Sequence, residues 1–237
     1  NIAEGNKLFN NPLPIVTQIE EEYLRSKGLP YIEFNGISSI DTNKSKVIGK
    51  LFEDMEPSFN SKETQDAYNA MIEETLEQYK TIISNGYSLE INNIEPYSNS
   101  GAMISDLRNN KRMKIFSTES GFGDEAITHK QRDENPLLVD TGLKDVNGET
   151  LLANDIFRFV HDFFGHAKLG NGFGAIGEEN AWQVHARMYS PLARRAMTTE
   201  TRGQNSWVNF SGINDKVFAE RDQARKLRKE GRLEEAD

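Results

Sequence analysis

Two of the chain's four histidines lie five residues apart in the segment HDFFGH, at His161 and His166. Imidazole is the commonest metal ligand among side chains, although histidines also border helices without binding anything. On an ideal α-helix, residues five apart point about 140° away from each other, so these two rings would diverge. We expect Gly165 to end or loosen the helix, because only then could both rings reach one ion. The spacing therefore permits a metal site but does not prove one.

Several residues downstream could supply the third ligand of such a site. Two histidines with one carboxylate are typical of non-haem Fe(II) oxygenases, and the same set, or three histidines, binds hydrolytic Zn²⁺. The chain has no cysteine, which excludes thiolate ligands and a thiol nucleophile. The metal is therefore expected to be Fe(II) or Zn²⁺. The candidates for the third ligand are Glu178, Glu179, His185 and Glu200.

Three polar residues are candidates for catalytic roles beside the metal. Asp162 directly follows the first histidine and could orient a ligand or a water molecule. Glu178, if it is not a ligand, could act as a general base. Arg202 could bind a carboxylate through two hydrogen bonds, or it could simply stabilise a turn. These side chains predict a small molecule or a protein side chain as the substrate.

The segment DIFRFVHDFFGH at 155–166 resembles the iron-binding segment of the aromatic amino acid hydroxylases, which carry His-Glu-x-x-Gly-His. Asp162 stands where that family has Glu. The segment TTETRGQ at 198–204 is similar to the family's Thr-x-Glu-Phe-Gly segment, whose Glu completes the iron site. The resemblance implies that His161, His166 and Glu200 bind ferrous iron in an oxygenase or hydroxylase. The chain has no segment that matches the family's pterin-binding or aromatic-substrate segments. The resemblance therefore does not imply a pterin cofactor.

The stretch that begins NDIFRFVHDFFGH also resembles a domain of large bacteriophage polypeptides. That resemblance implies a third possibility, a non-enzymatic domain of a virion or injected protein, with neighbouring parts of a larger polypeptide as partners. A zinc-dependent hydrolase, with Glu178 or Asp162 as the base, is the second possibility. The chain begins without Met and ends within a charged helical pattern, so we expect a segment of a longer polypeptide.

Composition limits where such a protein acts. The net charge of −9 argues against a nucleic-acid-binding surface, and the mean hydropathy is −0.66. No run approaches the roughly 20 apolar residues of a membrane helix, and the N-terminal segment lacks a signal-peptide pattern. We therefore expect a soluble protein in the cytoplasm of a bacterial host or associated with a virion, neither secreted nor bound to a membrane.

Hydrophobic periodicity predicts an α+β fold with a small mixed N-terminal half and a mainly helical C-terminal half that carries the site. We expect a single domain over 1–237, divided into 1–118, a loop or lid over 119–149, and a helical metal-site region over 150–237. In the N-terminal region, helices are predicted over 15–30, 61–86 and 101–110, and strands over 31–34, 87–97 and 111–118.

The helical region should begin at Asn154, a candidate N-cap, with Asp155 in the first turn. A second helix is predicted over 178–197, kinked or broken at Pro191. The segment 198–210 is polar and is expected to be irregular. An exposed helix should follow from Asn214.

Overall fold

The computed structural model describes residues 11–56, 58, 60–122, 127–215, 219 and 223. These residues form two compact units, one from the described parts of 1–40 and 57–202, the other from those of 41–56 and 203–237. All candidate site residues belong to the first unit. The predicted α+β class is confirmed, since short strands accompany a mostly helical C-terminal half. No helix in the described ranges is long and apolar enough to cross a bilayer.

Two of the N-terminal helices match the predicted ones. Helix α2 spans Ile15–Ser26 and stops before Gly28, whose φ of 67° lies in the left-handed region that favours glycine. Helix α4 spans Lys62–Ser84, and the Ser61 side chain caps it by accepting a hydrogen bond from the Thr64 amide. The strand predicted over 31–34 is wrong, because those residues have no regular secondary structure and pair with no described strand.

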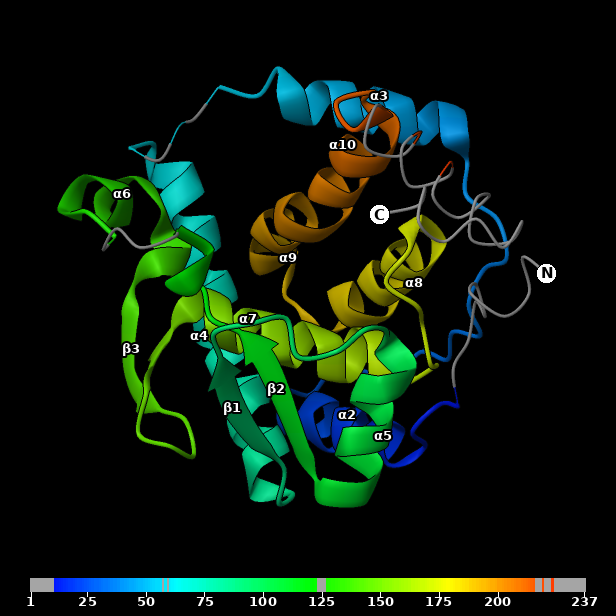
Figure 1. Ribbon diagram of the computed structural model, residues 1–237, viewed down its shortest axis with the longest axis vertical. Helices are drawn as coiled ribbons and strands as arrows, with labels where there is room; N and C mark the ends of the chain where they lie inside the picture. The colour runs from blue at the N-terminus through cyan, green and yellow to red at the C-terminus, as the bar shows by residue number, and fades with distance from the viewer. Residues whose placement is uncertain are drawn as a thin grey trace. The chain divides into compact units, whose positions relative to one another are not determined.

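The small sheet is a parallel pair joined by a helix. Strand β1 (Ser88–Asn92) pairs with β2 (Arg112–Phe116), and α5 (Ser100–Asn110) connects them, as a crossover between parallel strands requires. Figure 1 shows the two strands side by side, with α5 next to them. The three elements lie where the sequence pattern predicted them.

The segment 119–149 was expected to be a loop, and this is wrong for its described part. Helix α6 (His129–Glu134) is held by a capping box, in which Thr128 and Gln131 bond reciprocally. The sequence pattern missed these elements because they are short and mostly exposed, so they carry little hydrophobic periodicity. They are η1 (Ser120–Phe122), α6 (His129–Glu134), η2 (Pro136–Leu138) and β3 (Asp140–Lys144), which pairs antiparallel with β4 (Thr150–Leu152).

Helix α7 (Ala153–His161) begins one residue before the predicted cap. The Asp155 carboxylate accepts hydrogen bonds from the backbone amides of Leu152 and Thr118, each at 2.9 Å. It therefore satisfies a free amide at the start of the helix, while the Asn154 amide donates to the Thr118 hydroxyl. Asp155 thus has the predicted place in the first turn, but Asn154 is not the cap.

The rest of the C-terminal region is more helical than predicted. The break before Pro191 is confirmed, and the Ser190 side chain caps the helix that starts there. The segment 198–210, expected to be irregular, is helical. Most of the helix expected from Asn214 lies outside the described residues. The elements are a π-helix η3 (Asp162–Ala167), α8 (Ala175–His185), η4 (Ala186–Met188), α9 (Pro191–Thr198), a π-helix η5 (Thr199–Gly203) and α10 (Gln204–Phe210).

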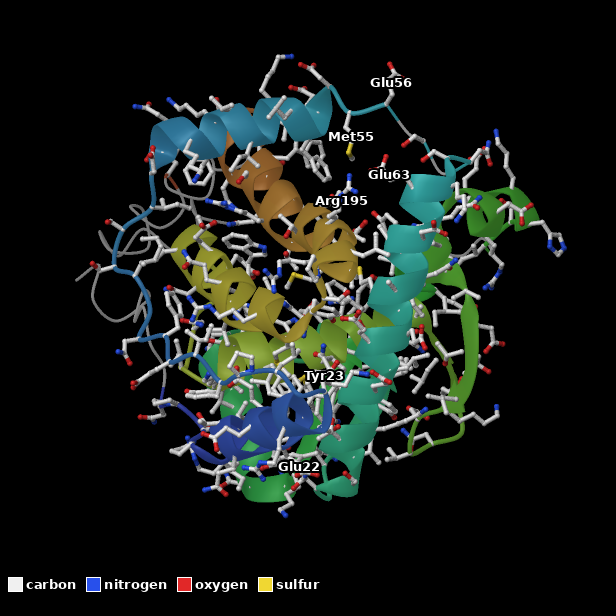
Figure 2. All side chains as sticks on the ribbon, turned by 180° about the vertical axis from the view of Figure 1, so that it is seen from behind. Glu22, Tyr23, Met55, Glu56, Glu63 and Arg195 are labelled. Carbon is white, nitrogen blue, oxygen red and sulfur yellow. The ribbon has the colours of Figure 1, made fainter. Side chains whose placement is uncertain are left out.

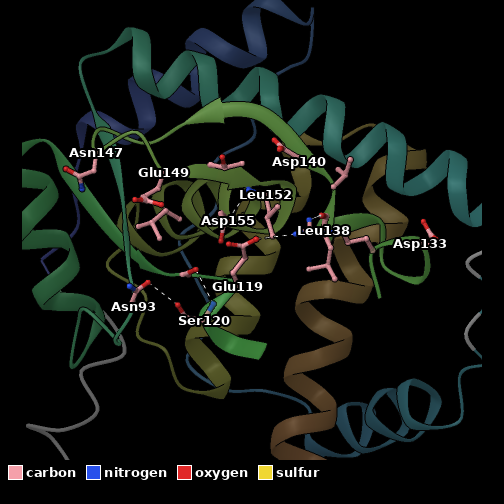
Figure 3. A pocket seen from close by; sticks show the side chains of 15 residues that line it. Asn93, Glu119, Ser120, Asp133, Leu138, Asp140, Asn147, Glu149, Leu152 and Asp155 are labelled. Atoms are coloured by element: carbon pink, nitrogen blue, oxygen red, sulfur yellow. Dashed lines mark hydrogen bonds and ion pairs between the residues drawn. The ribbon is translucent and has the colours of Figure 1, made fainter. Parts of the chain in front are cut away.

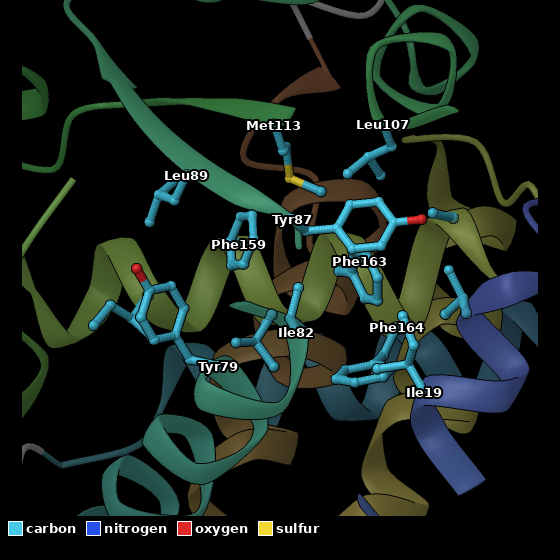
Figure 4. Packing of buried hydrophobic residues seen from close by; sticks show 14 of the residues in the cluster. Ile19, Tyr79, Ile82, Tyr87, Leu89, Leu107, Met113, Phe159, Phe163 and Phe164 are labelled. Carbon is cyan, nitrogen blue, oxygen red and sulfur yellow. The ribbon is translucent and has the colours of Figure 1, made fainter. Parts of the chain in front are cut away.

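The core of the first unit is built around α7 and η3. Figure 4 shows Phe159 and Phe163 between residues of the β1–α5–β2 layer on one side and residues of α4 on the other. Tyr79 and Tyr87 meet these two phenylalanines edge to face, with ring centroids 5.6 and 4.9 Å apart. Burial of the phenylalanine stripe thus fixes both the position and the rotation of the helix that carries the histidines.

Helix α9 packs against α4 near the start of α4. An exposed ion pair joins Arg195 and Glu63 at 2.7 Å, and both residues are labelled in Figure 2. In the second unit, α3 (Thr42–Glu53) packs against α10. A Cβ atom on Gly49 would lie 2.8 Å from the Ser206 carbonyl oxygen, so the contact requires glycine.

Candidate metal centre

A π-helical turn brings the two histidines together. His161 is the last residue of α7, and His166 lies in η3, which continues from α7 without interruption. A π-helix closes its hydrogen bonds between residues five apart, so these residues lie about one turn from each other. The imidazole centroids are 5.3 Å apart, and the rings are nearly perpendicular at 86°. Of the two alternatives expected at Gly165, the helix does not end there; it loosens, because it widens into a π-helix.

Gly165 also serves a purpose that the sequence did not predict. A Cβ atom at this position would lie 3.0 Å from the Ala181 Cβ and 3.1 Å from the Ala181 carbonyl oxygen. The missing side chain therefore lets α8 approach the π-helix closely. Glu178 lies three residues before Ala181 and so on the same side of α8. The close approach brings its carboxylate to the histidines.

Glu178 completes a group of three metal-binding side chains. Its Oε2 lies 3.4 Å from the His166 Nε2 and 3.8 Å from the His161 Nε2. One ligand atom from each residue lies within 4.8 Å of the other two. Ligands about 2.1 Å from a common ion are separated by roughly 3.0 to 3.4 Å, so a small inward movement would let all three bind one ion. The donor set and its spacing fit a divalent metal.

The charges in this group depend on one another. Burial alone would lower the pKa of His166, but the carboxylates of Glu178 and Asp162 raise it to about 9. Burial would raise the pKa of Glu178, yet the two histidines hold it well below its usual range. Without a metal, a protonated His166 therefore pairs with an ionised Glu178. A metal ion would replace that proton as the positive charge.

Asp162 lies beside the three ligand candidates. Its Oδ1 is 3.9 Å from the His166 Nε2, and burial raises the pKa of its carboxyl group. Its side chain is 24% exposed and that of Glu178 29%, whereas the two histidine side chains are almost fully buried. The two acids therefore form the side of the group that a substrate or water can reach.

Hydrogen bonds behind the histidines hold both rings by their Nδ1 atoms. The His166 Nδ1 lies 3.2 Å from the backbone oxygen of Asn171, and the His161 Nδ1 lies 3.1 Å from the His185 Nδ1. The His185 Nε2 in turn lies 2.8 Å from the Gln78 Oε1. His185, a candidate third ligand, thus stands behind His161 rather than beside the ligand atoms. Burial lowers its pKa well below the usual value, and the nearby histidines lower it further.

The Nε2 atom of His161 is buried and has no hydrogen-bond partner among the described residues. An unsatisfied buried nitrogen costs free energy, and native proteins contain few of them. This atom points to the position where Glu178 and His166 also present ligand atoms. A metal ion there would satisfy it.

Glu200 and Glu179 are not part of this group. The Glu200 carboxylate accepts a hydrogen bond from the Tyr68 hydroxyl, and burial raises its pKa. Glu179 is paired through both oxygens with Arg202, at 2.9 and 3.0 Å, and the guanidinium stacks 4.3 Å above the Trp182 ring. The structure therefore does not bring together the triad with Glu200 that the hydroxylase resemblance implies. The carboxylate that Arg202 binds is one of the protein's own.

A separate cavity of about 910 Å³ opens beside the β3–β4 hairpin (Figure 3). Its lining is polar and includes Glu119, Asp140, Glu149 and Asp155, but none of the three ligand candidates. The buried carboxylate of Asp155 is already occupied by the backbone amides at the start of α7. The cavity therefore does not share the histidine site.

Sequence reasoning identified the two histidines and placed Glu178 among the alternatives. It missed Gln78 and Asn171, which hold the histidine rings from behind. Asn171 lies five residues after His166, and this short spacing of a polar residue is the signal that points to it. Nothing in the sequence connects Gln78, on α4, with a histidine on α8.

The chain matches no protein-family model, no curated protein and no solved structure.

Proposed function

We propose that the chain is a metal-dependent enzyme that binds one divalent ion through His161, His166 and Glu178, and that it is an oxygenase or hydroxylase of the non-haem Fe(II) kind. The observation that carries the proposal is the buried His161 Nε2, which lacks a hydrogen-bond partner among the described residues and points at the two other ligand atoms. Two histidines and one carboxylate on one side of an ion are the ligand set of that enzyme class.

The residues around the group suit this chemistry. Bound Fe(II) would supply O₂ activation at the coordination positions that three protein ligands leave open. Phe157 stacks on the His161 ring with centroids 6.0 Å apart, and Phe173 lies 5.0 Å from the His166 ring, so both limit the access of water. Asp162 lies on the reachable side, where it would orient a substrate or hold a proton. The substrate class is a small molecule or a protein side chain.

A zinc-dependent hydrolase is the second candidate, and Asp162 is the observation that favours it. Zn²⁺ bound by two histidines and a glutamate makes its water acidic, and a nearby carboxylate serves as the base. Asp162 follows the first ligand directly, and burial raises its pKa, as a general base near neutral pH requires. Fe(II) remains the first choice because HDFFGH resembles the hydroxylase iron segment.

Metal analysis tests the proposal most directly. The full chain is purified with and without air, loaded separately with Fe(II) and Zn²⁺, and its metal content is measured. Retained iron at one ion per chain, with substrate-dependent O₂ consumption, supports the oxygenase; retained zinc with hydrolytic activity supports the second candidate. If neither metal is retained, both enzyme proposals fail and the non-enzymatic phage domain gains support.

A matched pair of histidine variants completes the test. His161→Ala should abolish metal binding with only a modest loss of folding. His129→Ala, at an exposed position on α6, should bind metal as the wild type does. An unfolded His161→Ala variant would instead indicate that the histidine mainly stabilises the core.

A further inference from the structure

We propose that Gln78 and His185 are positioning residues that fix the tautomer of His161, so that its Nε2 presents a lone pair to the metal ion. The inference rests on the proposed metal site and names the residues that prepare it. The atoms form a line from the Gln78 Oε1 through both ring nitrogens of His185 to the His161 Nδ1, with contacts of 2.8 and 3.1 Å.

The direction of these hydrogen bonds follows from the Gln78 oxygen. An amide oxygen can only accept, so the His185 Nε2 must carry the hydrogen. A neutral imidazole carries one hydrogen, which leaves the His185 Nδ1 as an acceptor. The His161 Nδ1 must then donate to it. The single hydrogen of neutral His161 is thereby held on Nδ1, and Nε2 is left with its lone pair.

Burial makes this arrangement the favourable one. His185 is 0% exposed, and the rings of Phe164 and Tyr189 flank it at 6.1 and 4.9 Å. A second proton would place a charge in this apolar surrounding, which costs free energy unless an opposite charge compensates it. Neither of the hydrogen bonds that His185 makes with Gln78 and His161 offers it a negative charge, so the ring stays neutral and its hydrogen position is set by Gln78.

The reverse arrangement would block the metal position. If the Gln78 amide were turned over, its nitrogen would donate to the His185 Nε2, and both ring hydrogens would move. His161 would then carry its hydrogen on Nε2, directed at Glu178. The other ligand, His166, is fixed in the same sense by the Asn171 backbone oxygen, which can only accept. The tautomer of each histidine is thus fixed by an oxygen acceptor: that of His166 directly by the Asn171 oxygen, and that of His161 through His185 by the Gln78 oxygen.

Three helices supply the parts of this line. Gln78 comes from α4, His161 from α7 and His185 from α8, and all three side chains are buried. A residue on α4 therefore acts on a metal ligand that it does not touch.

The tautomers can be read by long-range ¹H–¹⁵N NMR of the metal-free full chain. The chain has only four histidines, and His129→Ala assigns one by removal. The expected wild-type result is a hydrogen on the Nδ1 of His161 and on the Nε2 of His185. A His161 ring with its hydrogen on Nε2 would overturn the proposal.

Variants then connect the tautomer to metal affinity, with Zn²⁺ as the probe. His185→Leu and Gln78→Leu should both shift the His161 tautomer and weaken Zn²⁺ binding about 10- to 100-fold, as the loss of an outer hydrogen bond typically does. His185→Asn places an amide oxygen near the former Nδ1 and should restore both the tautomer and most of the affinity. Tyr68→Phe removes a partly buried hydrogen bond made by another residue of α4 and should change neither the tautomer nor the affinity.

The outcomes separate this inference from the proposed function. A wild-type tautomer and affinity in both leucine variants would overturn the inference, even with the metal site intact. A wild type that shows the expected tautomers but binds no metal would overturn the proposed function and leave the positioning by His185 standing. If His185→Leu does not fold, the wild-type spectrum and Gln78→Leu still decide the question.

Discussion

Helix α8 carries two adjacent carboxylates with opposite surroundings. Glu179 meets Arg202 through two hydrogen bonds, and guanidinium keeps its charge at every accessible pH. Glu178 meets two imidazoles, whose charge depends on whether a proton or a metal is bound. The protein therefore supplies the Glu179 carboxylate with a permanent cation, but it does not supply one to the Glu178 carboxylate.

The comparison separates a structural ion pair from a candidate binding site. In the region of Glu179, Arg202 and Trp182, each charged group has a permanent partner, so an added ion would gain nothing. In the region of Glu178, the His161 Nε2 is buried without a hydrogen-bond partner among the described residues. A buried nitrogen whose lone pair has no partner indicates a ligand that the protein chain does not itself provide.

Replacing each glutamate in turn gives the largest expected contrast. Glu178→Gln removes the only negative ligand of the group and should weaken Zn²⁺ or Fe(II) binding more than about 100-fold, since even outer partners contribute about 10- to 100-fold. Isothermal titration calorimetry on the full chain measures the affinity.

Glu179→Gln is the matched control, one residue further along the helix. It should leave the metal affinity within a few-fold of wild type but lower the free energy of unfolding on the order of 3 kcal/mol, because Arg202 loses its buried partner. Urea denaturation measures this change. If Glu179→Gln abolished metal binding and Glu178→Gln did not, the assignment of the ligand would be wrong.

The sequence could not decide between these two neighbours. It predicted two histidines and a downstream carboxylate, but Glu178, Glu179 and Glu200 all fit that pattern. The choice depends on the rotation of α8, which is set by the contact between Gly165 and Ala181. It also depends on the π-helix, whose extra residue per turn leaves no mark in the hydrophobic pattern.

The fold was easier to predict where burial is periodic. Helices α2, α4 and α5 and strand β2 bury regularly spaced residues, and their positions were predicted within a few residues; β1 was also predicted, but it ends at Asn92 instead of at residue 97. Helix α6 and strand β3 are mostly exposed, and η5 and α10 are polar, so hydrophobic periodicity did not reveal them. Segment 31–34 has a strand-like composition but pairs with no described strand.

The pH dependence of the metal-free protein should follow the pair of His166 and Glu178. The pKa of His166 is raised to about 9 in the folded chain, whereas histidines of an unfolded chain titrate near 6.5. The folded chain therefore binds this proton more tightly than the unfolded chain does. The stabilisation is complete below about pH 6.5, falls as the pH rises, and is lost above about 9. The expected loss is on the order of 3 kcal/mol.

Urea denaturation with a chelator at pH 6.5 and pH 9 measures this change. Glu178→Gln should flatten the dependence, whereas Glu179→Gln should preserve it, because the Glu179 carboxylate is paired with Arg202 and not with His166. A wild-type stability that is constant between the two pH values would contradict the pairing of His166 with Glu178.

Gly165→Ala tests how the incomplete region is assembled. The added methyl group would meet Ala181 at 3.0 Å, including backbone atoms, so α8 must move away by a few tenths of an ångström. We expect a loss of about 1 to 3 kcal/mol in unfolding free energy, and weaker metal binding because Glu178 moves with the helix. Gly174→Ala is the control, since nothing lies within 4 Å of a Cβ atom there. Equal effects of both substitutions on metal affinity would contradict this role of Gly165.

Tyr68→Phe has the smallest expected effect and decides between the two carboxylate assignments. The substitution removes the hydrogen bond to Glu200 and should cost about 1 kcal/mol in unfolding free energy. If Glu200 belonged to the metal site, as the hydroxylase resemblance implies, loss of this partner should also weaken metal binding about 10-fold or more. With Glu178 as the ligand, the affinity should stay unchanged. Calorimetric titration of the variant beside wild type thus tests directly whether Glu200 is only a partly buried, hydrogen-bonded acid.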